Sequence, residues 1–365
     1  MTMSHYTLYA APVSLFSGKA RSYLRWKGVA FKEVLSTPDV MKGILMPVIG
    51  WPVIPVLQTP KGELVQDTAD IIAHIEAAHD GPSVMPDGPV QHFVSELLHT
   101  FADQWLTLPA MHYRWNHNEE WTYAEFGKTA LPDAAPEEQY AIGKKRGQMF
   151  PGMVPMLGIT PETIPGIEAS YLAFLSEFSA HLEKYPYLFG GRPSLADFAF
   201  YGPLYAHLYR DPKSGEIMKS HAPLVADWVE RMRDGEQTYG ELVGCDAIPE
   251  TLLPMLARHF KEHLPVLEQT NDLLGAYAAK AKPEDDLPRA LGMANFEVEG
   301  HKGQTIARPF SLFRLQAALD IYDGLKGDKK IAADKVLEKT GGEGLKDFTL
   351  ANRLERRNYK LALVK

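Results

Sequence analysis

The sequence has little cysteine, because Cys245 is the only one among 365 residues. A single cysteine excludes a disulfide within the chain, and we expect a reducing, intracellular setting. Long apolar runs are also missing, since none approaches the ~18 residues that cross a bilayer. The first residues, MTMSHYTLYA, lack the basic start and the apolar segment of a signal peptide. We therefore predict a cytoplasmic protein without a membrane span.

Positive charge is scarce as well, since 38 Lys and Arg stand against 46 Asp and Glu. Nucleic acids and anionic membranes both favour a basic face. The formal net charge of -8 therefore predicts neither as a partner. The 45% hydrophobic and 23% charged residues are typical of a soluble globular protein, and the length predicts two or three domains.

The start of the chain predicts a strand–helix–strand unit. Residues 6–10 are apolar, aromatic and short, as in a buried strand. Pro12 ends that strand, and Ser14 or Ser17 can cap a helix that Gly28 closes. Residues 29–35 then predict a second strand, which such a crossover makes parallel to the first.

A proline marks the next predicted strand. After an expected loop over 37–52, residues 53–58 are apolar, but Pro55 is anomalous inside a central strand. A cis Ile54–Pro55 bond would explain it and would turn the Ile54 backbone towards a ligand. The turn residues Thr-Pro-Lys-Gly then predict an antiparallel return over 63–66.

A second capped helix follows that hairpin. Asp67 and Thr68 are good capping residues, and Ile71, Ile72 and Ile75 give the helix one apolar face.

The order of these motifs resembles the thioredoxin-like domain of the cytosolic glutathione S-transferase superfamily. The matching stretches are LYAAPVSLFSGKAR, LRWKGV, VIPVL and KGELVQDTADIIAHIE. The specific part is the Ile54-Pro55 step followed a dozen residues later by Asp67-Thr68. The resemblance implies an α/β thioredoxin-like domain over 1–82 and an all-α helical domain over 89–248.

The resemblance implies glutathione as co-substrate, with no metal. A free thiol has a pKa near ~8.5, and its thiolate is the nucleophile. A helix N-terminus offers partial positive charge and free amide donors, and a hydroxyl can add a charge-assisted hydrogen bond. Ser14 falls where the family carries its activating Ser or Cys, so it would stabilise the thiolate without being the nucleophile. Ser17 is the alternative.

The resemblance also implies how the rest of glutathione is held. Ile54, beside Pro55, would pair through its backbone with the cysteinyl part of the tripeptide, as an added strand. Asp67 would accept from the ligand's ammonium, and Thr68 would donate to its α-carboxylate. Val53 departs from the polar side chain that many relatives have beside the proline. Each of these features also has a purely structural interpretation. Ser14 or Ser17 and Asp67-Thr68 can be plain helix caps, and Pro55 can form a turn in a protein that binds nothing.

The helical part offers candidates for an electrophile pocket. From Val90 onward apolar residues keep helical spacing, and in the family this region lines the pocket for a small hydrophobic electrophile. A stripe of such side chains also suits a core. The candidates are Trp105, Met111, His112, Tyr113 and Trp115.

Two further segments stand out. Residues 118–165, with several Pro and Gly, predict an insertion at the pocket mouth or at a dimer interface. Ser194 and Asp197, in LFGGRPSLADFAFYGPLY, fit a reciprocal capping box and give a second family resemblance with a structural role.

The extension over 249–365 lies beyond the resemblance. It is expected to be mostly helical, with a possible hairpin at 296–308. His259 and His263 have the four-residue spacing that metal sites use. No third ligand is evident, so we expect a solvated helix face.

Three functions compete at this point. One is a glutathione transferase for conjugation, or for glutathione-dependent isomerisation or ether cleavage, with a detoxifying role. Another is a non-catalytic scaffold of the same fold. The third, a thiol–disulfide oxidoreductase, needs a cysteine where Ser14 and Ser17 stand, which disfavours it. Relatives pair two-fold, so the resemblance implies a homodimer.

Overall fold

The computed structural model describes residues 5–282 and 285–364, so residues 1–4 of the expected first domain lie outside it. Contacts divide the chain into two compact units, each made of three segments. Unit 1 comprises Met1–Val84, Ala110–Met153 and Phe198–Tyr239. Unit 2 comprises Met85–Pro109, Val154–Asp197 and Gly240–Lys365. Both units therefore draw on the region from 89 to 248.

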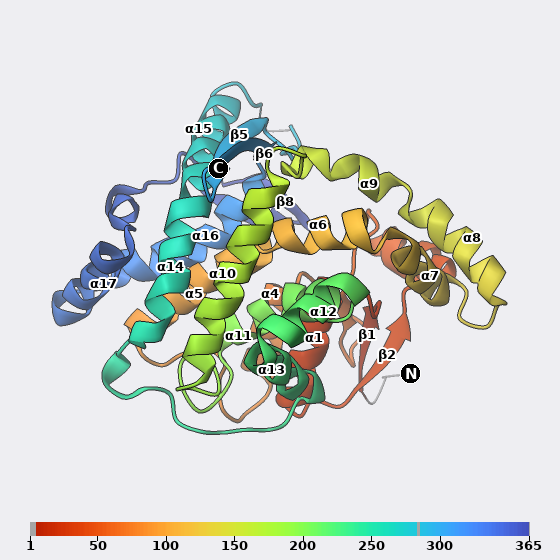
Figure 1. Ribbon diagram of the computed structural model, residues 1–365, viewed down its shortest axis with the longest axis horizontal. Helices are drawn as coiled ribbons and strands as arrows, with labels where there is room; N and C mark the ends of the chain where they lie inside the picture. The colour runs from red at the N-terminus through yellow and green to blue at the C-terminus, as the bar shows by residue number, and fades with distance from the viewer. Residues whose placement is uncertain (1–4, 283–284, 365) are drawn as a thin grey trace. The chain divides into compact units, whose positions relative to one another are not determined.

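Unit 1 contains a mixed four-stranded sheet in the order β2-β1-β3-β4, and Figure 1 labels its strands β1 and β2. β1 and β2 are parallel, and β3 is antiparallel to both β1 and β4. Helices α1 and α4 pack on each other. The bounds are β1 Tyr6–Ala10, α1 Leu15–Trp26, β2 Phe31–Leu35, β3 Val56–Gln58, β4 Leu64–Gln66 and α4 Thr68–Ala78. This confirms the predicted α/β thioredoxin-like architecture and its parallel crossover.

The segment predicted as a loop over 37–52 is helical, so that prediction is wrong. It holds α2 Pro38–Val40, the π-helical η1 Met41–Leu45 and α3 Met46–Ile49. The Thr37 hydroxyl accepts from the Val40 amide at 3.3 Å, which starts the helix. Gly50 ends it with φ of 84°, a conformation that favours glycine.

Two glycines let a helical hairpin close within unit 1. α7 Glu119–Ala130 and α8 Pro136–Gly147 pack on each other, and α9 Met149–Met153 follows (Figure 1). A Cβ built on Gly143 would lie 1.8 Å from the Tyr123 carbonyl oxygen, and one on Gly127 would lie 1.8 Å from that of Gln139. The Pro- and Gly-containing stretch is therefore ordered helix at this point, and its glycines permit close backbone approach.

The remaining elements of unit 1 are short helices. They are α6 Thr107–His117, η3 Leu204–Tyr209, α12 Pro212–His221 and α13 Pro223–Asp234. α6 begins in unit 2 and continues in unit 1, as does α11.

Unit 2 is helical with two small hairpins, and α5 and α16 pack along each other. Its helices of nine residues or more are α5 Pro89–Gln104, α10 Ile164–Leu182, α11 Leu195–Pro203, α15 Leu264–Ala278, α16 Pro309–Gly324 and α17 Gly327–Thr340. Its shorter turns are η2 Pro155–Leu157, η4 Gly244–Asp246, η5 Glu250–Leu252, α14 Leu253–Arg258, η6 His259–His263 and η7 Glu343–Asp347. The strands are β5 Met293–Val298, β6 His301–Ile306, β7 Leu354–Arg357 and β8 Lys360–Leu363.

The capping box is half confirmed. The Asp197 carboxylate accepts from the Ser194 amide at 2.8 Å, as predicted. The Ser194 hydroxyl donates to the same carboxylate at 2.8 Å, where a reciprocal box would have it accept from the helix. Asp197 also accepts from the Leu188 amide at 3.0 Å, so it fixes the preceding turn as well.

The extension corrects one expectation and confirms another. β5 and β6 form the predicted hairpin. His259 and His263 are 0% and 2% exposed, so the prediction of a solvated face is wrong. Phe101 and Trp105 cover these imidazoles in unit 2, with ring centroids 5.6 and 5.2 Å away.

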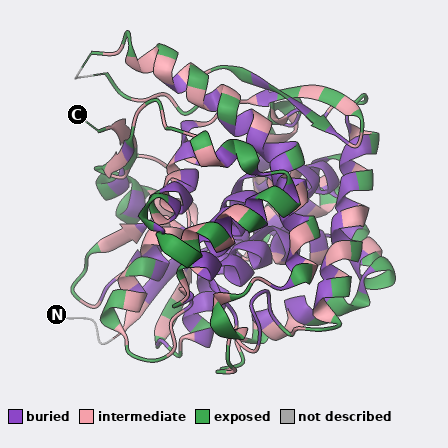
Figure 2. Ribbon diagram, turned by 90° about the vertical axis from the view of Figure 1, so that its left-hand side faces the viewer, coloured by how far each residue is buried: buried purple, intermediate pink, exposed green. Residues whose placement is uncertain are grey.

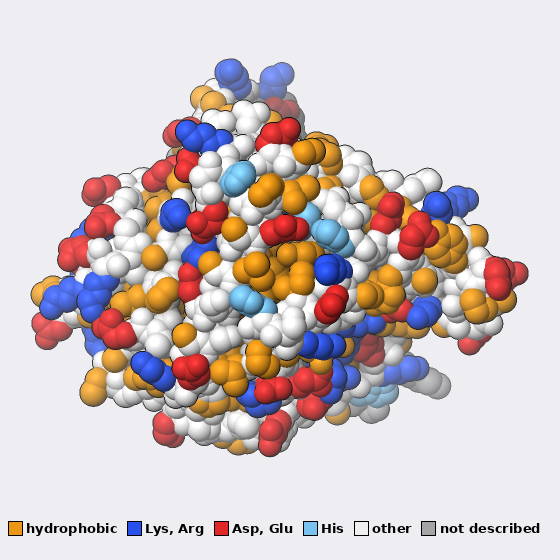
Figure 3. All heavy atoms as spheres, viewed as in Figure 1, with side chains coloured by type: hydrophobic (Ala, Val, Ile, Leu, Met, Phe, Trp, Pro, Cys, Tyr) orange, Lys and Arg blue, Asp and Glu red, His pale blue; other side chains and the backbone are white. Residues whose placement is uncertain are grey.

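Surface and interior are clearly separated. Figure 2 shows helices with buried faces in purple and exposed faces in green, as expected of amphipathic helices. On the face shown in Figure 3, acidic and basic side chains are intermingled. Among the described helices, none combines the length and the apolarity needed to cross a bilayer.

Candidate functional site

The predicted glutathione-binding residues leave the sheet at one edge. Across the sheet, Tyr9 pairs with Val56, and Val56 pairs with Gln66. This row lies near the end of β1, at the start of β3 and at the end of β4. At this end of the sheet, β1 leads to Ser14, Ile54 and Pro55 lead into β3, and β4 leads to Asp67.

Ser14 is the N-cap of α1. Its hydroxyl oxygen accepts from the Ser17 amide at 3.3 Å, while its own amide donates to the Ala11 carbonyl at 3.2 Å. A hydroxyl has one proton to donate besides its lone pairs. Within the described residues nothing accepts that proton from Ser14, which is partly exposed. The site thus presents a free hydroxyl donor beside the positive end of a helix.

Ser17 is placed differently. It is 0% exposed, and its hydroxyl accepts from the Ala11 amide at 3.3 Å. The side chain therefore fastens the turn between β1 and α1 from inside.

The Ile54–Pro55 bond is cis, as predicted from the anomalous proline. The ladder of β3 begins at Val56, so the Ile54 backbone lies outside it. Pro55 is buried and Ile54 is partly exposed.

Asp67 and Thr68 start α4. Asp67 is its N-cap and accepts from the Ala69 amide at 2.9 Å. Its φ of 84° is rare for a residue other than glycine, and such outliers occur preferentially at functional sites. Thr68 is 3% exposed at the first position of the helix. The amide donors of this helix start lie at the same sheet edge as Ser14.

Sequence reasoning did not identify the buried arginine that supports the Ser14 loop. Arg114, on α6, donates to the Val13 carbonyl at 2.7 Å and to the Ala206 carbonyl at 2.7 Å. Its guanidinium also makes two 2.7 Å bonds to the Asp211 carboxylate. Burial raises the pKa of Asp211, and the bonds from Arg114 oppose that rise. The sequence does contain a signal for this role, which is a charged residue inside the apolar stretch AMHYRW. Buried arginines are rare unless they are paired, so an arginine at this position predicts a buried partner.

The electrophile candidates do not form one group. Trp105 belongs to unit 2, where its indole donates to Glu262 at 2.9 Å. Trp115 stacks on Phe150 with ring centroids 5.3 Å apart. Both tryptophans therefore have packing partners in their own units.

The other three candidates lie on the unit 1 part of α6. His112 is 1% exposed and its Nδ1 lies 2.9 Å from the Asn116 amide nitrogen. Tyr113 is 3% exposed. Met111 is partly exposed, and it lies three residues before Arg114, so the two share a helix face.

A mixed four-stranded sheet with two capped helices at one edge, followed in sequence by a helical part, defines a thioredoxin-like protein with a helical second domain and an extra segment that contains two small hairpins. Residues 8–83 match the family model described as "Glutathione S-transferase, N-terminal domain". Residues 161–231 match "Glutathione S-transferase, C-terminal domain". The chain belongs to the glutathione S-transferase superfamily, as its sequence motifs predict, and carries an additional C-terminal segment.

Several solved structures are similar to part of this chain at low sequence identity. A beta-etherase from Sphingobium sp. strain SYK-6 is 19% identical, with a TM-score of 0.46, 64% of this chain covered and 95% of the other. A glutathione transferase from Phanerochaete chrysosporium is 17% identical, with a TM-score of 0.45 and coverage of 66% and 100%. A glutathione S-transferase from Rhodospirillum rubrum F11 is 15% identical, with a TM-score of 0.41 and coverage of 67% and 96%. Among curated proteins, none matches the sequence significantly.

Proposed function

We propose that this protein is a glutathione transferase that uses Ser14 to hold the thiol of glutathione as a thiolate. The free Ser14 hydroxyl at the start of α1 is the observation that carries the proposal. Its proton can point to sulfur while its oxygen still caps the helix. Charge-assisted bonding and the helix dipole both favour the anion, so the thiol loses its proton to solvent near neutral pH.

The tripeptide would lie along the sheet edge. Ile54, whose backbone is outside the β3 ladder, would pair with the cysteinyl residue next to the buried Pro55. Asp67 would accept from the γ-glutamyl ammonium, and the Thr68 amide and hydroxyl would donate to the α-carboxylate. These placements fit the chemistry of the donors and acceptors at that edge.

The electrophile would be a small hydrophobic molecule beside α6, with Met111 as its contact. Met111 is the partly exposed candidate on the helix face that carries Arg114, and Arg114 reaches the Val13 carbonyl directly before Ser14. The thiolate would form a sulfur–carbon bond and expel the leaving group with its bonding electrons. Conjugation and ether cleavage both follow this step, and isomerisation begins with thiolate addition.

Replacing Ser14 by Ala tests the proposal. Loss of a hydrogen bond to a charged group costs ~1.5–3 kcal/mol, so the pKa of bound glutathione should rise by about 1–2 units. Turnover at neutral pH should fall about 10–100-fold with little change in glutathione affinity. The measurements are a spectroscopic thiol titration of the complex and steady-state kinetics with an aromatic halide.

The matched control is Ser17→Ala, which removes a buried hydroxyl and should leave the pKa of the bound thiol unchanged. An unshifted thiol in Ser14→Ala would reject the role of Ser14. Absence of glutathione binding by the wild type would support the scaffold function. We also propose a cytoplasmic homodimer; sedimentation showing a monomer would contradict the dimer.

A further inference from the structure

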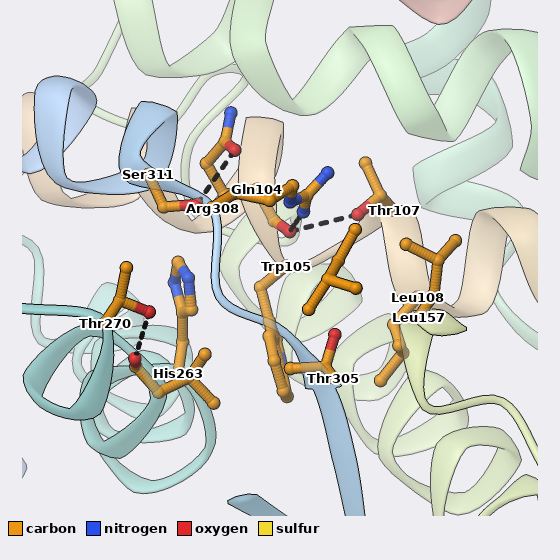
Figure 4. Close-up of a pocket in the computed structure, with 12 residues that line it drawn as sticks. Gln104, Trp105, Thr107, Leu108, Leu157, His263, Thr270, Thr305, Arg308 and Ser311 are labelled. Carbon is orange, nitrogen blue, oxygen red and sulfur yellow. Dashed lines mark hydrogen bonds between the residues drawn. The ribbon is translucent and has the colours of Figure 1, made fainter. Parts of the chain in front are cut away.

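A pocket lies within unit 2, where the end of α5 meets η6, α15, β6 and the start of α16 (Figure 4). Its empty space is about 370 Å³ when the open solvent at its mouth is included. Polar and apolar side chains both line it. Its lining includes Gln104, Trp105, Leu108, His263, Arg308 and Ser311.

Arg308 brings a positive charge without a counter-charge from the chain. Within the described chain, its guanidinium donates to the Gln104 carbonyl at 3.1 Å. No carboxylate of residues 5–282 or 285–364 forms an ion pair with it, and burial lowers its pKa with no acid opposing that effect. A guanidinium is always charged and presents its donors as a planar fork that matches an oxyanion.

Other unused donors face the same space. The Ser311 hydroxyl donates to the Gln104 side-chain oxygen at 3.1 Å (Figure 4). This bond fixes the orientation of the Gln104 side-chain amide. Its NH₂ group then has no hydrogen-bond partner within the described chain. Arg308 is also the N-cap of α16, whose start has no side-chain cap. The positive end of a 16-residue helix therefore adds to the field at this pocket.

The imidazole of His263 is a second, independent sign of a ligand. It is 98% buried by side-chain packing, being 2% exposed, and its Nδ1 has no hydrogen-bond partner among the described residues. Burial, His259 and Arg308 together lower its pKa well below the usual value. A neutral imidazole with an unused nitrogen beside a cation can donate to an anion held at that cation.

We propose that this pocket binds the carboxylate of a small organic acid. Arg308 would supply the counter-charge, Gln104 and His263 would donate the further hydrogen bonds, and Trp105 and Leu108 would contact the apolar body. Every lining residue belongs to unit 2. The site is thus additional to the glutathione chemistry proposed for unit 1 and does not depend on it.

A carboxylate fits better than a phosphate. The pocket offers one permanent positive charge, which balances a monoanion, whereas a phosphate carries up to two negative charges at neutral pH. The apolar lining residues Trp105 and Leu108 can contact the hydrocarbon part of an organic acid, and an inorganic ion has no such part. The nearby acid Glu262 does not compete, because Arg258 neutralises it at 2.8 Å and the Trp105 indole donates to it.

Calorimetric titration of the full chain with sodium benzoate tests the proposal. The titration is done at constant ionic strength and without glutathione, whose own carboxylates would compete. Benzamide serves as the neutral isostere, and inorganic phosphate as the other source of an oxyanion. We expect saturable binding of benzoate, at least about tenfold weaker binding of benzamide, and phosphate weaker than benzoate.

The variant Arg308→Gln should weaken benzoate binding at least about tenfold. Lys302→Gln is the matched control, because it removes one exposed positive charge from β6 and should leave the affinity unchanged. If Arg308→Gln does not fold, Arg308→Lys and Ser311→Ala take its place, and both should weaken binding. Unchanged affinity in the pocket variants, equal binding of benzamide, or tighter binding of phosphate would overturn the assignment.

Discussion

Arg114 in unit 1 is buried and Arg308 in unit 2 is partly exposed, and the chain treats their charges differently. Arg114 meets Asp211 through two 2.7 Å bonds and spends its remaining donors on two backbone carbonyls. Arg308 donates to one carbonyl and pairs with no carboxylate in the described residues. The difference teaches that a cation serving the fold is given its counter-charge by the chain. A cation without one is available to a ligand.

A second buried group, His259, shows what an uncompensated side chain does when it can give up its charge. His259 is 0% exposed, and neither ring nitrogen has a partner among the described residues. Burial lowers its pKa to about 3, so it stays neutral. Arginine cannot neutralise in this way, which is why Arg308 keeps an unsatisfied charge.

Arg114→Met is expected to have the largest effect, because it removes the arginine that is paired with Asp211. Removing one partner of a buried pair leaves Asp211 charged and alone, which costs ~3–5 kcal/mol of unfolding free energy. Because the Val13 carbonyl also loses a donor, turnover should fall while the glutathione KM changes less. Denaturant unfolding and steady-state kinetics measure the two effects. Loss of less than ~1 kcal/mol would show that the pair does not stabilise unit 1.

His259→Phe tests whether His259 is buried in its neutral form. Between pH 6.5 and about 3 the unfolded chain binds a proton at His259 and the folded chain does not. Unfolding free energy therefore falls with decreasing pH by up to about 1.4 kcal/mol per unit from this group. Between pH 6.5 and 4.5, the unfolding free energy of the variant should therefore fall by about 2–3 kcal/mol less than that of the wild type. His181, with a pKa lowered to about 4, keeps part of the slope. An unchanged slope would mean that His259 is protonated in the folded protein.

Arg353→Gln tests whether an ion pair of the same geometry contributes as much stability when it is exposed to solvent. Arg353 makes the same two 2.7 Å bonds to Asp320 that Arg114 makes to Asp211. Its side chain is 53% exposed and that of Asp320 46%, against 3% and 0% for the buried pair. Solvent screening should limit the loss to ~0–1 kcal/mol in the same unfolding assay. A loss equal to that of Arg114→Met would make burial irrelevant to the comparison.

Arg308→Gln should have the smallest effect on stability. It removes a charge that the fold does not compensate, so the unfolding free energy should stay within ~0.5 kcal/mol of the wild type or rise. The same denaturant titration measures it without added organic acid. A loss of several kcal/mol would place Arg308 in the structural class with Arg114.

Much of unit 1 could be predicted because its signals are local. Short apolar runs, turn residues and capping residues located the strands of the sheet and the two helices beside it, and a proline that is anomalous in a central strand indicated the cis bond. The helical turns between β2 and β3 were missed, since their Met- and Gly-rich sequence has weak periodicity. In unit 2, neighbouring rings bury His259 and His263, and four-residue spacing alone could not show those rings.

The sequence by itself determined the thioredoxin-like order of elements and placed Ser14, Ile54 and Asp67 at the chain's turns, because caps and hairpins depend on neighbouring residues. Only the tertiary structure decided which charges are compensated. Arg114 and Asp211 are 97 residues apart, and Arg308 and Gln104 are 204 apart. Whether a cation finds a carboxylate or faces an open pocket depends on how distant segments pack, and no local pattern carries that information.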